Sequence, residues 1–514
     1  MFKELISNIL GSYAVRRVAR VSHASKYPKK TQRKVFLSLI QRGRLTDWGR
    51  KHSFGSIKTI EDFRKNVPLS TYEDLYPWIE RALAGERNIL WPGKVKMFAK
   101  SSGTTNARSK FIPVTKASLH EAHFRGGKDM IALYLERNPK STFLFHKSLA
   151  ITGSLAPSPL HPNILCGDVS AVLTKQLPLL AEINRVPARS IALLSKWEDK
   201  AKHIVVRANS FDVSSLIGTP TWVARLVDEI IKKNDVKDIF AVWPNLEVFF
   251  HGAVSFRPYR PLFKDLFGDR VQFVETYNAS EGFFAIQDVP DQEGMLLMLD
   301  YGIFYEFIPM TEFGNKDATV YTIEEVKEGI NYAVVISTSG GLWRYIIGDT
   351  VRFVSTKPYR VVITGRTKQF INAFGEEVVV ENVEQAVLTA CLETGAIIEN
   401  FTVGPQFMTH KEGGHHQWVV EFSKLPDNTK KFEQIIDETV RSLNSDYDAK
   451  RNGDAILAKP IFDYVPLGTF YTWMKERGKL GGQHKVPRLA NDREYVDAIM
   501  NLINQHNKPK QDGK

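Results

Sequence analysis

Residues 101–110 read Ser-Ser-Gly-Thr-Thr-Asn-Ala-Arg-Ser-Lys, and the interpretation of the whole chain starts from them. The stretch combines hydroxyl side chains, one turn glycine and a closing cation: Ser101, Ser102, Thr104 and Thr105, then Gly103 and Lys110. Hydroxyls donate to anionic oxygens, glycine allows close backbone approach, and a lysine adds a point charge. This inventory suits a polyphosphate. A polar Ser/Thr hairpin is the alternative, because such residues favour turns in any case.

The flanks of this stretch predict a loop between two strands. Residues 95–100 and 111–115 both have the composition of short extended segments, and Pro113 marks an edge or a bend. The spacing differs from the Walker pattern G-x-x-x-x-G-K-[ST], since Gly103 stands alone and Lys110 comes late. A strand-to-helix phosphate cradle is therefore not expected.

Length and composition indicate a large globular protein. A chain of 514 residues with 43% hydrophobic and 25% charged residues predicts at least two domains. No stretch approaches eighteen consecutive apolar residues, so we expect no spanning helix and no membrane partner. Two cysteines, Cys166 and Cys391, fit a reducing cytosol. We expect a cytoplasmic protein, with a monomer favoured.

The net charge of +12 permits two interpretations. Nucleic-acid binding is one, but the basic residues are spread along the chain and no basic run is interleaved with aromatic residues. Anionic small substrates such as ATP are the other, and we favour them.

The N-terminal segment 2–44 is poor in acids and rich in Arg, Lys and Ser, as in an organelle transit peptide. Apolar residues at helical spacing favour a folded helix instead, with the expected buried face formed by Val35, Leu37, Leu39, Ile40 and Leu45.

Alternating strands and helices follow, which predicts an α/β fold with helix-covered sheets. The expected helices are 60–68, 71–80, 117–137, 187–199 and 221–232, and the expected strands are 142–151, 246–251 and 271–277. From residue 295 short strands dominate, at 296–299, 303–308, 319–323, 332–338, 342–347, 351–355 and 360–364. With Gly340-Gly341 and Gly348-Asp349 as turns, they resemble a small antiparallel barrel.

A compact α+β domain is expected after Arg366. It has expected helices at 380–392, 430–443 and 470–475 and strands at 401–403, 417–422 and 461–465. We therefore predict a large N-terminal domain, 1–366, and a small C-terminal domain, 367–514.

Three further motifs contain residues suited to nucleotide chemistry. Tyr277-Asn278-Ala279-Ser280-Glu281-Gly282 follows an apolar run, and ligands bind at strand ends in such sheets. Glu281 could hold Mg²⁺ and Tyr277 could stack on a base. The alternative is a helix start, capped by Ser280.

The second motif is Trp343-Arg344-Tyr345-Ile346-Ile347-Gly348-Asp349, in which Asp349 could accept both hydroxyls of a ribose. A turn aspartate that bonds its own backbone is the alternative. Arg366 ends another expected strand and could reach the same sugar. The third motif, Gly481-Gly482-Gln483-His484-Lys485, places Lys485 on a glycine-rich stretch, where a solvated surface charge is the alternative.

Taken together, these motifs resemble an adenylate-forming enzyme, and more closely the Gretchen Hagen family of auxin-responsive acyl acid amido synthetases. The resemblance also covers Phe63-Arg64 through Pro68, Tyr72, residues 88–93 and residues 483–488, so it spans essentially the whole chain. It implies an α/β adenylate-forming domain and a mobile α+β C-terminal domain.

The resemblance also implies a role for each matched residue. Phosphate contacts would come from Ser101, Ser102, Gly103, Thr104, Thr105 and Lys110. Tyr277 would flank adenine, while Ser280 and Glu281 would lie near the α-phosphate and Mg²⁺. Asp349 and Arg366 would hold the ribose, and Lys485 would enter the site for adenylation. Gly252 and Ala253 follow an apolar run, and we predict that they lie against the adenine face.

The implied reaction uses ATP and Mg²⁺ to convert a small carboxylic acid to an acyl-AMP, which then reacts with an amino acid amine. Transfer to coenzyme A, or nucleotide binding without turnover, are the alternatives. Residues 211–222 and 249–256 are expected near the acid. Their aromatic and apolar content suits a small hydrophobic or aryl acid without specifying one.

Overall fold

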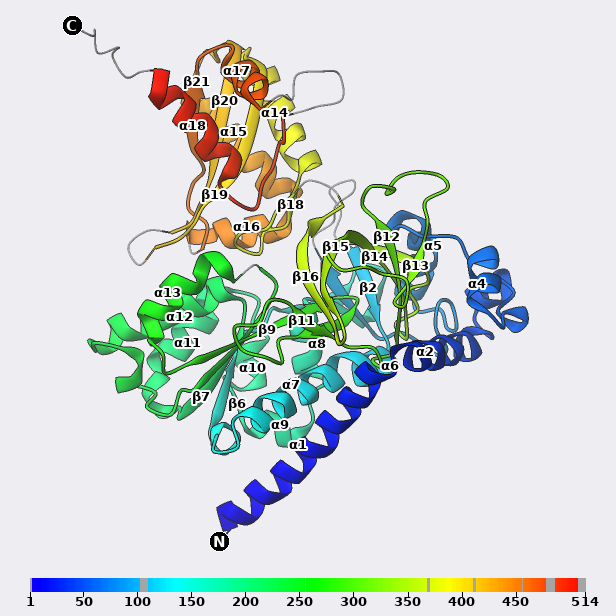
Figure 1. Cartoon of the computed structure of the whole chain (residues 1–514). Coiled ribbons are helices and arrows are strands. Elements are labelled where there is room, and N and C mark those ends of the chain that lie inside the picture. Colours follow the sequence, from blue (N-terminus) through cyan, green and yellow to red (C-terminus); the bar gives the residue numbers. More distant parts are fainter. Residues whose placement is uncertain are drawn as a thin grey trace, which may run out of the picture. The chain divides into compact units, whose positions relative to one another are not determined.

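The structure is a computed structural model that describes residues 2–101, 110–254, 256–367, 370–409, 413–454, 456–477 and 486–506. The chain divides into two compact units (Figure 1). The first comprises Met1–Ser101, Lys110–Ala253 and Lys264–Thr367, and the second includes Val254–Phe263 and Lys368–Lys514. Among the described residues, no helix is both long and apolar enough to cross a membrane.

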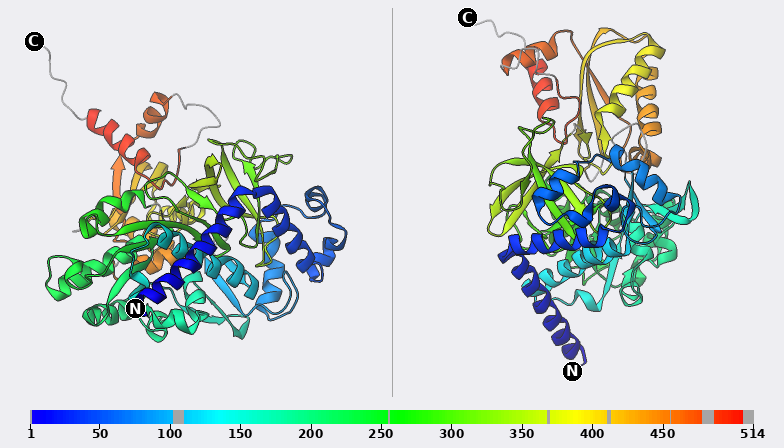
Figure 2. Two further views of the ribbon diagram at one scale, coloured as in Figure 1. Left: turned by 60° about the horizontal axis from the view of Figure 1, so that its bottom comes forward. Right: turned by 90° about the vertical axis from the view of Figure 1, so that its right-hand side faces the viewer.

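The first unit begins with two helices, α1 (Phe2–Lys26) and α2 (Pro28–Gly43), as expected for a folded N-terminus. In Figure 1 and the right-hand view of Figure 2, α1 stands away from the rest of its unit toward its N-terminal end. Its other end is held by Asp129, which is fully buried and accepts hydrogen bonds from the Arg17 Nε at 2.6 Å and the Arg20 Nη2 at 3.0 Å.

The prediction of which residues form the buried face of α2 is only partly correct. Leu39 and Ile40 are buried, together with Phe36, but Leu37 is 40% exposed and Leu45 is 64% exposed. The helix buries one stripe, and Leu37 lies beside that stripe.

Two helices of this unit begin at threonine caps. Helix α4 (Ile60–Asn66) is capped by Thr59 and α5 (Tyr72–Leu83) by Thr71, each with an aspartate three residues later that completes a capping box. The other helices of this unit are α3 (Asp47–Lys51), α6 (Lys116–Ser118), α7 (Phe124–Arg137), α8 (Val169–Lys175), α9 (Leu179–Ile183), α10 (Arg189–Ala192), α11 (Trp197–Val206) and α12 (Pro220–Asn234), and α13 (Arg260–Phe267) spans the two units.

The single helix expected at 187–199 is wrong, because α10 and α11 are separate. The carbonyl of Ala192, where α10 ends, accepts a hydrogen bond from the Thr152 hydroxyl at 2.8 Å. A tertiary contact therefore provides a hydrogen-bond partner for a backbone carbonyl at the end of α10. The sequence does not reveal the break between α10 and α11, because no glycine or proline lies there.

Twelve strands of the first unit form one sheet, in the order β13-β12-β14-β15-β16-β11-β10-β9-β8-β7-β3-β6. Their bounds are β3 (Lys147–Ala150), β6 (Arg185–Val186), β7 (Val213–Gly218), β8 (Val248–His251), β9 (Gln272–Ala279), β10 (Gly282–Ile286), β11 (Met295–Leu297), β12 (Ile303–Pro309), β13 (Tyr321–Thr322), β14 (Asn331–Thr338), β15 (Tyr345–Thr356) and β16 (Tyr359–Arg366).

This sheet has a parallel half and an antiparallel half. Strands β6, β3, β7, β8 and β9 pair in parallel. From β9 onward, in the order β10, β11, β16, β15, β14, β12 and β13, every pairing is antiparallel. The expected barrel strands are therefore not a separate sheet but continue the parallel one. Helix α12 packs against β7, and α8 packs against the strands of a smaller sheet (Figure 1).

The smaller sheet contains the two strands that flank residues 102–109. Its order is β2-β1-β5-β4, with bounds β1 (Met97–Ser101), β2 (Lys110–Val114), β4 (Leu155–Ser158) and β5 (His161–Gly167). Strands β1 and β2 are antiparallel and Ser101 pairs with Lys110. The prediction of a strand on each side of residues 102–109 is confirmed.

The second unit is a sheet covered by helices on both faces. Strands β19 (Ile397–Gln406), β20 (His415–Lys424) and β21 (Ile461–Val465) form the sheet, and β17 (Phe370–Ile371) pairs with β18 (Val378–Val379). Its helices are α14 (Val380–Thr394), α15 (Thr429–Leu443), α16 (Ser445–Arg451), α17 (Thr469–Glu476) and α18 (Glu494–His506). Val419 packs with α17 and α18, whereas Phe422 packs against Phe432 of α15. The expected α+β composition is confirmed.

Candidate functional site

The motif at residues 277–282 forms a β-hairpin. Strand β9 ends at Ala279, β10 begins at Gly282, and Ser280 and Glu281 are the two turn residues between them. The alternative of a helix start is therefore wrong. This hairpin is also where the parallel half of the sheet meets the antiparallel half, so the turn lies at a strand end, as expected for a ligand site.

Asp349 does not lie in a turn, contrary to the sequence expectation. Strand β15 continues through it to Thr356, and the separate strands expected at 342–347 and 351–355 are one. On β14, Val335 pairs with Ile346 and Ala333 with Thr350, so the three residues from Ile347 to Asp349 lie opposite Val334 alone. Gly348 has a φ of +96° within this bulge. A bulge redirects side chains, which explains how Asp349 reaches its partners.

Tyr277, Asp349 and Arg366 are joined directly. The Tyr277 hydroxyl donates to Asp349 Oδ2 at 2.6 Å, and the Arg366 Nε donates to Asp349 Oδ1 at 3.1 Å. Burial, followed by the charge of Asp349, holds the pKa of Tyr277 well above its ordinary value, so the phenol stays protonated.

These contacts require the sheet to curl. Four strand-to-strand steps separate β9 from β15, which is about 19 Å in a flat sheet. A tyrosine and an aspartate side chain together span far less, so the antiparallel half bends back toward β9. The sheet therefore has a barrel-like curvature without being a separate barrel.

Glu281 and Lys110 add opposite charges to this cluster. Both are nearly buried, with 9% and 8% of their surface exposed. Burial raises the pKa of Glu281 to about 7, and the nearby charge of Lys110 opposes that rise. The carboxyl of Glu281 therefore changes between its protonated and ionised forms near neutral pH.

The end of the predicted phosphate loop is held by Tyr72. The backbone N–H of Phe111 donates to the Tyr72 hydroxyl at 2.8 Å, and Lys110 Nζ lies 5.7 Å from the centre of the Tyr72 ring. Tyr72 is thus a supporting residue for Lys110. Nothing in the local sequence around Tyr72 indicates this contact, which joins residues 39 positions apart.

Gly252 and Ala253 follow β8 directly, as predicted. A Cβ on Gly252 would lie 2.5 Å from the Thr276 carbonyl oxygen, so β9 requires a glycine there. Ala253 has a φ of +73°, which is unusual for a residue with a side chain. The carboxyl ends of β7 and β8 lie side by side, with Gly218 opposite His251. Contact with adenine or an acid stays a prediction.

Several predicted site residues lie outside the described residues. These are Ser102, Gly103, Thr104, Thr105 and Lys485, whose roles stay predictions. Among the described members of the expected nucleotide site, the structure brings together Lys110, Tyr277, Glu281, Asp349 and Arg366, and Ser101 pairs with Lys110.

Tyr345 belongs to the same cluster, although sequence reasoning assigned it no role. Its side chain is fully buried, and its hydroxyl has no hydrogen-bond partner among the described residues. Leaving a buried hydroxyl unpaired costs about 1–3 kcal/mol. The neighbouring Arg344 donates from Nε to Glu306 Oε2 at 2.9 Å and anchors the start of β15.

The donor set fits Mg²⁺ held together with a substrate. Within the part of the chain that the structure describes, no three or more His, Cys, Asp and Glu side chains gather as a metal site. Mg²⁺ in phosphate-transfer sites takes one or two carboxylates, with other ligands from phosphates and water. Glu281 beside Lys110 matches this requirement.

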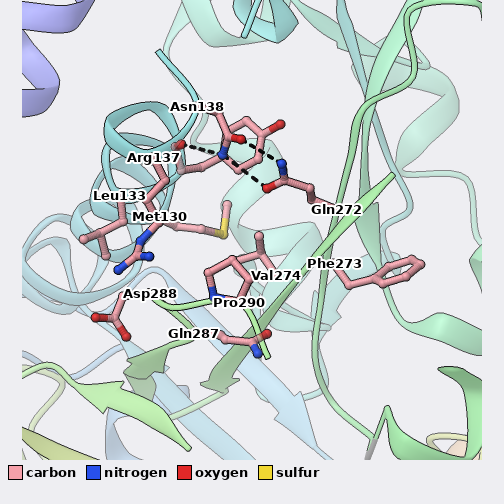
Figure 3. Close-up of a pocket in the computed structure, with 11 residues that line it drawn as sticks. Met130, Leu133, Arg137, Asn138, Gln272, Phe273, Val274, Gln287, Asp288 and Pro290 are labelled. Atoms are coloured by element: carbon pink, nitrogen blue, oxygen red, sulfur yellow. Dashed lines mark hydrogen bonds between the residues drawn. The ribbon is translucent and has the colours of Figure 1, made fainter. Parts of the chain in front are cut away.

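A separate cavity lies away from this cluster. It is lined by the C-terminal part of α7, the first residues of β9 and the segment after β10 (Figure 3). The amide groups of Asn138 and Gln272 bond to each other there, and Asp288 is paired with Arg360. Gln272 is eight residues, or about 25 Å of strand, before Ser280, so the cavity is not part of the candidate site.

Comparison with known proteins identifies the family. The GH3 family N-terminal domain matches residues 17–272, the GH3 family central domain residues 296–366, and the GH3 family C-terminal domain residues 381–494. The chain is 24% identical to the indole-3-acetic acid-amido synthetase GH3.4 of Arabidopsis thaliana, over 95% of this chain and 93% of that protein. It is 25% identical to the 4-substituted benzoates-glutamate ligase GH3.12 of the same plant, over 86% and 90%.

A solved structure shares the fold. The AtGH3.15 acyl acid amido synthetase in complex with 2,4-DB superposes with a TM-score of 0.62 at 17% identity, over 96% of each chain. Three family domains in order and near-complete coverage agree with the motif resemblance. The chain therefore belongs to the GH3 family, the Gretchen Hagen family to which its motifs pointed.

Proposed function

We propose that this chain is a ligase that uses ATP to adenylate a small carboxylic acid and then joins the acyl group to the amine of an amino acid. The observation that carries the proposal is the cluster of Lys110, Glu281, Asp349 and Arg366 at one β-hairpin, in a chain of the GH3 family. Relatives whose names include an amido synthetase and a glutamate ligase support this reaction class.

Each end of the nucleotide has proposed partners. Asp349 accepts the ribose hydroxyls, with Arg366 and Tyr277 holding its carboxylate in place. Lys110 and the hydroxyls of the loop, Ser101, Ser102, Thr104 and Thr105, contact the phosphates, with Gly103 allowing close approach. Adenine lies between Tyr277 and the strand end at Gly252 and Ala253.

The first half-reaction joins the acid to the α-phosphorus. A carboxylate oxygen forms a bond to the α-phosphorus, the bond to the β-phosphate breaks, and pyrophosphate leaves. Both reactants are anionic, so Lys110 and Lys485 would favour the reaction by neutralising charge. Glu281 and the adjacent Ser280 would hold Mg²⁺ near the α-phosphate, and Mg²⁺ when bound supplies further charge neutralisation on the phosphate oxygens.

The second half-reaction uses the activated carbonyl. The amine nitrogen bonds to the carbonyl carbon, the carbon–oxygen bond to AMP breaks, and the amine releases a proton. Because the mixed anhydride hydrolyses readily, the site must exclude water between the two steps. We propose that residues 367–514 form the moving domain that does so, and that Lys485 enters for adenylation only.

ATP–pyrophosphate exchange over a panel of carboxylic acids tests this proposal. We expect exchange with at least one small hydrophobic or aryl acid, and then AMP and an amide when an amino acid is added. Coenzyme A, supplied in place of the amino acid, tests the thioester alternative. No acid-dependent exchange across the panel, despite intact ATP binding, would contradict the proposed activity.

Removing the Tyr277 hydroxyl should weaken the binding of a nucleoside but not that of pyrophosphate. In Tyr277→Phe, the Asp349 carboxylate loses one of its two donors, and adenosine affinity should fall about threefold to tenfold, the usual value of one hydrogen bond. Isothermal titration with adenosine, and with pyrophosphate as the comparison, measures this.

Tyr332→Phe is the matched control, because the Tyr332 hydroxyl accepts from the Lys327 N–H at 3.0 Å and its ring packs against Phe307, Tyr321 and Phe353. It should leave adenosine affinity unchanged. Equal losses for adenosine and pyrophosphate in Tyr277→Phe would show that the tyrosine supports the whole site rather than the ribose end.

A further inference from the structure

Tyr345 is the first residue of β15 and its backbone is fixed on both sides. The Ser70 N–H donates to the carbonyl of Arg344, and the Ile346 N–H donates to the carbonyl of Ser70, each at 2.9 Å. The Arg344 guanidinium is paired with Glu306, a buried residue. The backbone of Tyr345 is therefore held in place, and we expect its side chain to be well ordered.

The hydroxyl of Tyr345 differs from those of other buried tyrosines in this unit. Tyr277 donates to Asp349, Tyr301 to Asp129, and Tyr305 to the carbonyl of Met298. Tyr345 is equally buried, yet its hydroxyl finds no partner in the described part of the chain. Buried polar groups are nearly always paired, so this donor calls for an explanation.

Tyr345 interacts with the charged groups of the cluster, and with Glu281 most strongly. The groups with which it interacts electrostatically include Glu281, Arg366 and Tyr72, and Tyr72 contacts Lys110 where β2 begins. Burial, followed by the charge of Glu281, holds the pKa of Tyr345 well above its ordinary value. The group is therefore a neutral phenol that can donate one hydrogen bond.

We propose that the Tyr345 hydroxyl donates a hydrogen bond to a phosphate oxygen of the bound nucleotide, and that Tyr345 is thus a phosphate-binding residue of this site. The inference rests on the proposed function and extends it to a residue with no assigned role. A phosphate oxygen is favoured over ribose because the ribose hydroxyls can themselves donate to Asp349, whereas phosphate oxygens only accept and need donors from several sides.

Tyr345→Phe tests the proposal with two measurements that should move in opposite directions. Titration with Mg²⁺ and the non-hydrolysable analogue AMP-PNP should give about tenfold weaker binding, which corresponds to about 1.4 kcal/mol. The unfolding temperature without nucleotide should stay the same or rise, because the variant loses an unpaired buried hydroxyl. Adenosine affinity should not change.

Tyr305→Phe is the control, since Tyr305 is equally buried but its hydroxyl is bonded to Met298. It should lower the unfolding temperature and leave AMP-PNP affinity unchanged. Unchanged AMP-PNP affinity in Tyr345→Phe would overturn the inference alone, and so would an equal loss for adenosine. A wild-type protein that bound no AMP-PNP would overturn the proposed function, and the inference with it.

Discussion

Lys485→Ala should reduce acyl-adenylate formation by on the order of a hundredfold or more, while amide formation from supplied acyl-adenylate stays near normal. A cation beside the pentacoordinate phosphorus stabilises that transition state. It contributes little when a neutral amine attacks a carbonyl carbon, because far less negative charge then accumulates on phosphate. The two half-reactions are measured separately, as pyrophosphate exchange and as amide formation from synthetic adenylate.

Lys475→Ala provides the matched control, since Lys475 is an exposed lysine on α17 in the same unit. It should change neither half-reaction. If both half-reactions fell equally in Lys485→Ala, the lysine would have a general role in binding, and the proposal of a domain that moves between steps would lose its main support.

Glu281→Gln should reduce pyrophosphate exchange on the order of a hundredfold at low Mg²⁺, because the amide cannot replace a carboxylate ligand. The loss should shrink as Mg²⁺ is raised. Glu293→Gln is the control, because Glu293 forms an exposed pair with Arg352 and should be dispensable. Unchanged exchange in Glu281→Gln would remove Glu281 from the metal site.

The pH profile gives an independent test of the same residue. Burial raises the pKa of Glu281 from 4.5 to about 7, so its carboxyl takes up a proton as the pH falls through 7. Metal binding needs the ionised form, and exchange at limiting Mg²⁺ should therefore fall between pH 8 and pH 6 in the wild type. Glu281→Gln should lack this dependence.

The free energy of unfolding should change with pH in the direction opposite to pyrophosphate exchange. A carboxyl whose pKa is raised on folding favours the folded state at low pH, and that contribution is lost as the pH rises through about 7. At pH 8 the variant with a neutral amide should therefore be at least as stable as the wild type. Denaturant unfolding at pH 5 and pH 8 measures the difference. A variant less stable at pH 8 would mean that the ionised carboxylate supports the fold.

The local sequence alone determines those features that depend only on neighbouring residues, such as helix caps. Thr59 and Thr71 cap α4 and α5 through aspartates three positions later, and such contacts depend on residues within one turn. The order of the polar motifs also identified the family, because each motif is a short segment with its own chemical composition. Ser102 to Thr105 and Lys485 lie outside the described residues, so their part of the site is still inferred from sequence alone.

Only the tertiary structure decided how the motifs become a site. Gly348-Asp349 has the composition of a turn, but pairing with β14 and β16 makes it a bulge inside β15. The hydroxyl of Tyr277 reaches Asp349 across 72 positions of sequence, because the antiparallel half of the sheet curls. Burial raises the pKa of Glu281, and the charge of Lys110, which is 171 positions away in the sequence, opposes that rise. Strand register, sheet curvature and burial depend on chain segments far apart in sequence, and no local pattern encodes them.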